Sequence, residues 1–114
     1  MRKQLMEDAA YEVATQVRTV EESIEAALAE VADLQSKMIH ARAVTRAGFV
    51  SSHAAFEQIA ATVSSLVAAR GGIGNCHVAL VDAKQTIPGL RTVAFGEPDE
   101  CPPPMARADL RVVA

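Results

Sequence analysis

The feature that most constrains this chain is an apolar repeat in residues 6–45. Twelve positions follow one another at alternating spacings of four and three. A period of 3.5 residues sustained over so many turns indicates a helix that supercoils against a neighbouring helix. No Gly or Pro interrupts the repeat. Its members are Met6, Ala10, Val13, Val17, Val20, Ile24, Ala27, Val31, Leu34, Met38, Ala41 and Thr45.

A second apolar repeat follows a single glycine. Phe49, Phe56 and Val63 recur every seven residues, with Ile59 and Leu66 between them. This pattern predicts a second helix of the same kind. The 114 residues contain no Trp, one Tyr and three Phe, so the core must be built from small aliphatic side chains, which suits closely packed helices.

The end of the second repeat contains a glycine pair. Gly71 and Gly72 predict the end of that helix, and Asn75 is a suitable cap for a short third helix that Pro88 would stop. All five prolines lie within residues 88–104, which predicts an extended tail. We therefore expect a helical domain in residues 1–87 and a Pro-rich docking tail in residues 88–114. The expected apolar anchors of the tail are Phe95, Leu110 and Val112.

The connection between the two repeats decides the fold. A left-handed Gly48 would end the first helix in a Schellman motif and bring Phe49 against Val44. Ser51 or Ser52 would then supply the N-cap oxygen of the next helix. The alternative is one continuous helix in which the repeat contains a stutter. The hairpin is favoured, because glycine inside a helix costs about 1 kcal/mol. The predicted fold is therefore all-α: a long, coiled-coil-like helical hairpin with a short third helix.

Two helices alone leave much of their surface in water. Between Arg46 and Arg70 the only formal charge is Glu57, so the second helix has no strongly polar face. A helix that is apolar or small on every side is usually buried on every side. We therefore predict that another chain (a copy or a helical protein partner), the Pro-rich tail, or both cover it. The predicted interface residues are Val13, Val17, Val20, Ile24, Val31, Leu34, Phe56, Ile59, Val63 and Leu66.

No stretch of the sequence assembles a catalytic or metal site. The segment "GGIGN" follows a helix and lacks a P-loop lysine, which favours a helix terminator over a phosphate site. Cys76 and His77 are adjacent, but no second Cys or His pair lies at metal-ligand spacing. The sequence also shows no pattern that would bring a nucleophile, a general base and an orienting group together in an active site. We therefore expect neither an enzyme nor a bound cofactor.

Charge and hydropathy narrow the classes of partner and location. The formal net charge is −3 and the basic residues are scattered, which argues against nucleic-acid binding. Residues 47–69 are the least charged segment but contain too many polar residues for a transmembrane span. The first residues do not read as a secretory signal, so we expect a cytoplasmic protein whose two cysteines stay reduced.

These observations predict a non-enzymatic structural or adaptor protein that self-assembles or binds a helical partner. The Ala-rich amphipathic helices resemble those of phasins, which coat polyester storage granules, and this resemblance implies the alternative of a coat adsorbed to a lipid or polymer surface. A hairpin of about this length with glycine at its turn also resembles WXG100-type secreted proteins, although "TRAGF" lacks their Trp. Neither family is assigned. A third alternative, a small-ligand pocket in a dimeric bundle, would require Cys76 or His77 to point inward.

Overall fold

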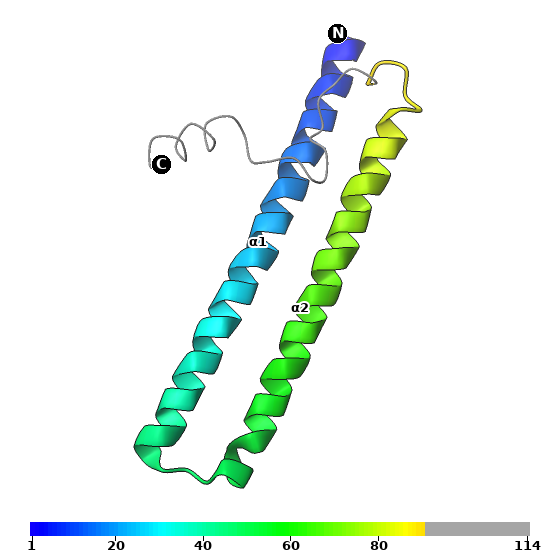
Figure 1. The fold of residues 1–114 in the computed structure, drawn as a ribbon. Coiled ribbons are helices and arrows are strands. Elements are labelled where there is room, and N and C mark those ends of the chain that lie inside the picture. Colours follow the sequence, from blue (N-terminus) through cyan, green and yellow to red (C-terminus); the bar gives the residue numbers. More distant parts are fainter. Residues whose placement is uncertain (91–114) are drawn as a thin grey trace, which may run out of the picture. The chain divides into compact units, whose positions relative to one another are not determined.

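The computed structural model describes residues 1–90, and its regular structure there consists of two long helices. Helix α1 spans Arg2–Thr45 and helix α2 spans Phe49–Lys84. Figure 1 shows a short connection between them, which confirms the predicted hairpin and excludes the continuous helix. Contacts between residues divide the chain into two units. One is Thr15–Cys76, and the other combines Met1–Ala14 with the residues from His77 onward.

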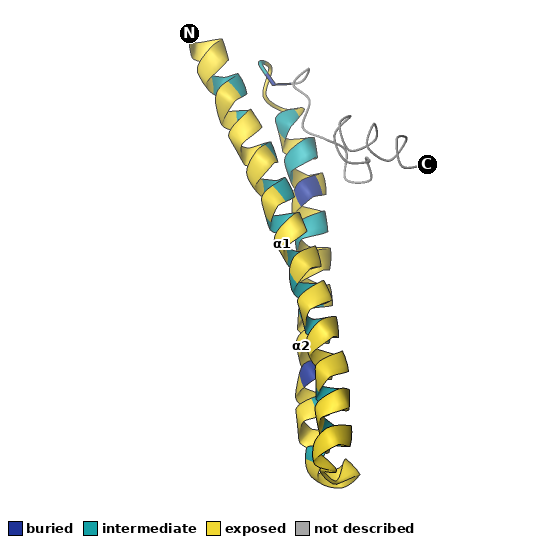
Figure 2. Ribbon diagram, turned by 90° about the vertical axis from the view of Figure 1, so that its left-hand side faces the viewer, coloured by how far each residue is buried: buried dark blue, intermediate teal, exposed yellow. Residues whose placement is uncertain are grey.

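The seam of the Thr15–Cys76 unit follows the two apolar repeats. Ile59 on α2 is buried, with 8% of its surface exposed, and most of the other seam side chains are half-buried, whereas Leu34 and the members nearest the turn are exposed. Figure 2 shows that most of both helices remains exposed. A single helical neighbour covers only one face of each helix, which explains this pattern. The half-buried seam residues include Val17, Val20, Ile24, Val31 and Met38 on α1, and Phe56, Val63, Leu66 and Ile73 on α2.

The predicted third helix is wrong as a separate element. Helix α2 continues through Gly71, Gly72 and Gly74 and ends at Lys84. Each of these glycines costs the helix about 1 kcal/mol relative to alanine. The alternating spacing nevertheless continues past them, through Ile73 and His77, and both side chains are at least half-buried. Burial along the seam therefore outweighs the local preference of the glycines.

The turn between the helices is a Schellman motif, but it lies two residues before the predicted position. The left-handed residue is Arg46, with φ of 56°, rather than Gly48. The N–H of Ala47 donates to the carbonyl of Arg42 at 3.2 Å, which is the long hydrogen bond of this motif. The Arg42 side chain donates to the Ala47 carbonyl at 3.4 Å. The expected partners Val44 and Phe49 are 67% and 73% exposed.

The start of α2 also differs from the prediction. Gly48 occupies the N-cap position, because its carbonyl accepts the N–H of Ser52 at 3.1 Å. The hydroxyls of Ser51 and Ser52 donate to the same carbonyl, at 3.0 and 2.9 Å. Neither serine therefore acts as the predicted N-cap acceptor. Hydroxyls within the first turn can reach a carbonyl three or four residues back, and here they do so.

The other unit contains the first turns of α1, the last turns of α2 and a short extension. After Lys84, the N–H of Ile87 donates to the Lys84 carbonyl at 3.1 Å, and the N–H of Leu90 donates to the Ile87 carbonyl at 2.9 Å. Pro88 is the second residue of this last turn, a position that suits its fixed φ. Leu90 is buried and lies three residues beyond the predicted domain boundary, which stays a prediction. The tail anchors Phe95, Leu110 and Val112 lie outside the described residues.

Candidate functional site

An apolar groove in the unit formed by Met1–Ala14 and the residues from His77 onward is the first candidate site. Its volume is about 340 Å³. The turn of residues 87–90 closes one side of it, and a Cβ placed on Gly89 would lie 3.1 Å from the Met6 methyl carbon. Glycine therefore permits this close approach. The groove is lined by Met6, Ala9, Ala10, Val13, Leu80, Ala83, Lys84, Ile87 and Leu90.

The chemistry of this groove is that of an apolar binding surface. Among the described residues that line the groove, Lys84 is the one ionisable side chain and the others are apolar. These residues can bind an aliphatic group. The sequence analysis did not single out Ile87 and Leu90 as lining residues. The sequence "IPGL" could have indicated them, because Pro88 and Gly89 favour a turn, and a turn brings the apolar residues Ile87 and Leu90 close together.

The predicted interface residues fall into two groups. Most lie on the half-buried seam between the helices of the Thr15–Cys76 unit, where hairpin packing already uses one side of each. Val13 and Leu34 are more accessible, with 43% and 52% of their surfaces exposed. The structure contains a single chain, so their role in an interface between chains stays a prediction.

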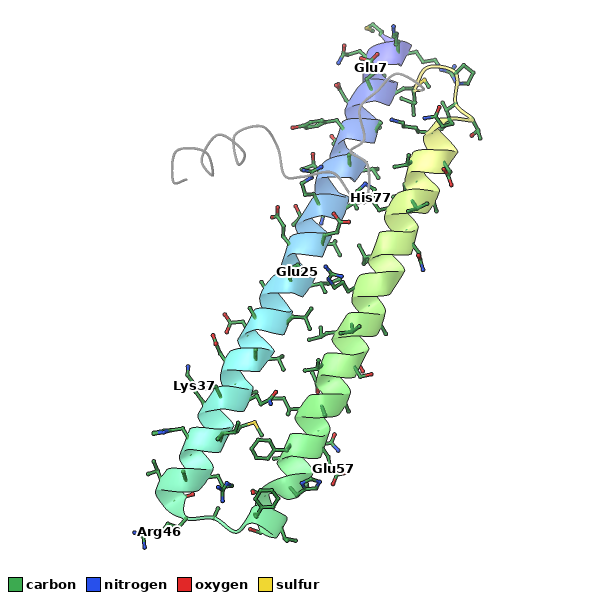
Figure 3. All side chains as sticks on the ribbon, in the orientation of Figure 1. Glu7, Glu25, Lys37, Arg46, Glu57 and His77 are labelled. Atoms are coloured by element: carbon green, nitrogen blue, oxygen red, sulfur yellow. The ribbon has the colours of Figure 1, made fainter. Side chains whose placement is uncertain are left out.

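Cys76 and His77 point in different directions. Cys76 is an exposed free thiol, whereas His77 is 5% exposed. Figure 3 places His77 on α2. Neither residue lines the apolar groove. Among residues 1–90 no group of three or more His, Cys, Asp or Glu side chains could hold a metal ion.

An ion pair between Glu25 and Arg70 connects the helices of the Thr15–Cys76 unit. The Arg70 guanidinium donates to the Glu25 carboxylate, and Glu25 lies on the side of α1 that faces α2 (Figure 3). The hydrogen bond that Arg70 donates to Glu25, followed by the negative charge of Glu25, raises the pKa of Arg70. The two side chains are 58% and 62% exposed, so water screens the pair. The pair therefore contributes little to the stability of the hairpin.

Comparison with known proteins returns no relative. Nothing matches this chain among protein-family models, curated proteins or solved structures. Neither of the two resemblances noted in the sequence is therefore supported by a match. Within residues 1–90, no helix is long and apolar enough to cross a bilayer.

Proposed function

We propose that this protein is a non-enzymatic structural or adaptor protein that assembles with copies of itself, or with a helical partner, through coiled-coil-like helix packing. The proposal includes the cytoplasmic location predicted from the sequence. The main support is the lack of charge on the exposed outer face of α2. This face is defined as a set of residues that lie opposite the seam in the Thr15–Cys76 unit. Its residues are exposed and uncharged: Ala54, Gln58, Ala61, Ser65, Ala68, Gly72 and Asn75. The charged residue Glu57 lies at the edge of this face.

A solvated helix face normally contains charged residues. The outer face of α2 contains small residues instead, and small residues allow two helix backbones to approach closely. Gly72 supports the same interpretation. A Cβ added to Gly72 would meet no atom within 4 Å outside the backbone of its own helix and its chain neighbours. Packing among the described residues therefore gives no reason for glycine at this position, whereas a second helix laid along this face would.

The limited burial within the chain is a second support. Of the described residues, only Ile59, Leu90 and His77 are buried. Large apolar side chains such as Leu34 and Val67 remain more than half exposed. A domain of this size would ordinarily bury a larger core. Association of chains would remove this apolar surface from water, and each Å² removed contributes about 25 cal/mol.

The experiment measures the molar mass in solution of the parent protein and of two variants in which one alanine is replaced by glutamate. Multi-angle light scattering at micromolar concentration should give an oligomer for the parent. Ala68→Glu places a charge on the outer face of α2, and it should reduce the mass while far-UV circular dichroism stays unchanged. Ala32→Glu makes the same change at an exposed position of α1 and should leave the mass unchanged. A folded, monomeric parent that binds no helical partner would contradict the proposal.

A further inference from the structure

The hairpin tip, defined as residues 37–53 around the connection between α1 and α2, presents large apolar side chains to solvent. Phe49 is 73% exposed and Val50 is 87% exposed. Val44, on the other side of the connection, is 67% exposed. Figure 2 shows that the connection and its flanking helix ends are almost entirely exposed. Two consecutive apolar residues at the start of a helix, with so little cover, form an exposed apolar patch.

The charge of the hairpin tip is opposite to that of most of α1. Residues 1–36 contain three basic and eight acidic residues, a net charge of −5. The hairpin tip contains Lys37, Arg42 and Arg46 and no carboxylate. The nearest acid on α2, Glu57, lies 3.5 Å from His53. Lys37 and Arg46 extend from the ribbon at this end of the hairpin (Figure 3). The basic charge and the apolar patch therefore coincide.

The local geometry fixes the two kinds of side chain next to each other. The Arg42 guanidinium lies over the Phe49 ring, 5.8 Å from its centroid. The same guanidinium donates to the Ala47 carbonyl. Arg42 thus holds Phe49 beside the left-handed residue Arg46, and the apex presents a ring, a Val side chain and cations in one small area.

We propose that the hairpin tip binds peripherally to anionic lipid membranes. Anionic headgroups attract Lys and Arg, and Phe and Val side chains lower their free energy by entering the headgroup–acyl boundary. A bilayer offers both environments at one surface, because the apolar acyl chains lie directly beneath the anionic headgroups. An acidic polypeptide would satisfy the cations but would leave Phe49 and Val50 in water, and for this reason the membrane is the better match. The site is separate from the outer face of α2, so it does not depend on self-association.

The expected size of the effect follows from the charges. A basic residue close to an anionic bilayer strengthens binding about fivefold. Replacing two of them, Lys37→Gln with Arg46→Asn, should therefore weaken binding roughly 25-fold. Asn is chosen at position 46 because it tolerates a left-handed backbone. Replacing Phe49 and Val50 by Ser should weaken binding about tenfold or more, since their burial at the interface is lost.

The test is cosedimentation of the full chain with vesicles. We expect binding to phosphatidylcholine vesicles that contain about one-third phosphatidylserine, weak binding to phosphatidylcholine alone, and a decrease at high salt. The matched control is Arg2→Asn with Lys3→Gln, which removes the same charge from exposed positions at the start of α1. Circular dichroism of each variant verifies that the helices are retained, and Arg42 is left in place because it supports the turn.

Three results would overturn the proposal. The first is equal sedimentation of the parent with neutral and anionic vesicles. The second is a loss of binding in the control as large as that in the tip variant, which would indicate a general charge effect. The third is binding to soluble polyglutamate as tight as that to vesicles, with no effect of replacing Phe49 and Val50, which would identify an acidic polypeptide as the partner.

Discussion

Replacing Arg46 by glycine should stabilise the protein. Arg46 has φ of 56°, in the left-handed region, where a residue with a Cβ is strained by about 1–2 kcal/mol. Glycine removes this strain, but it also gives the unfolded chain more conformational entropy, which costs about 0.4–1 kcal/mol. The central values of the two effects leave a net gain in the free energy of unfolding of about 0.8 kcal/mol. For a domain of this size that gain corresponds to an increase in melting temperature of about 2–8 °C.

The assay is thermal unfolding followed by circular dichroism at one fixed protein concentration, because association would shift the melting temperature. Arg46→Ala is the matched control. It removes the same side chain but keeps the Cβ, so its melting temperature should stay near that of the parent. Gly48→Ala should bring no gain, because Gly48 is not left-handed and a Cβ there would lie 3.1 Å from the Ser51 hydroxyl.

The reasoning would be refuted if Arg46→Gly melted at or below the temperature of Arg46→Ala.

Further predictions follow from burial. Ile59→Ala should lower the free energy of unfolding by about 2 kcal/mol in urea titrations, and Leu5→Ala by less than about 1 kcal/mol, since Ile59 is buried and Leu5 is 69% exposed. A chain ending at residue 87 should melt at a lower temperature than one ending at residue 90, because Leu90 is lost; equal melting would show that its burial is unimportant. In a Cys101→Ser background, Cys76 should react with a thiol reagent in the native state as fast as in urea, and a protected thiol would contradict its exposure.

The two helices could be predicted from the sequence alone, since their pattern is local. An apolar residue every three or four positions places one side of a helix in contact with a neighbour wherever the chain leads. The hairpin was also predictable, because Gly48 and the serines after it interrupt the helical pattern between the repeats. Of the candidate sites, the uncharged character of the second helix was visible in the sequence, and it still carries the proposed function.

The tertiary structure decided where α2 ends and which residue of the turn is left-handed, because at these places the local preferences of single residues compete with packing. A glycine pair favours a helix end, yet α2 continues through Gly71 and Gly72 because seam positions on both sides of them gain burial. Glycine is the usual left-handed residue, yet Arg46 adopts that conformation, and contacts of Arg42 with Ala47 and Phe49 support the turn around it. Local preferences of about 1 kcal/mol are too small to decide such cases, because burial and side-chain contacts between distant residues are of the same size or larger.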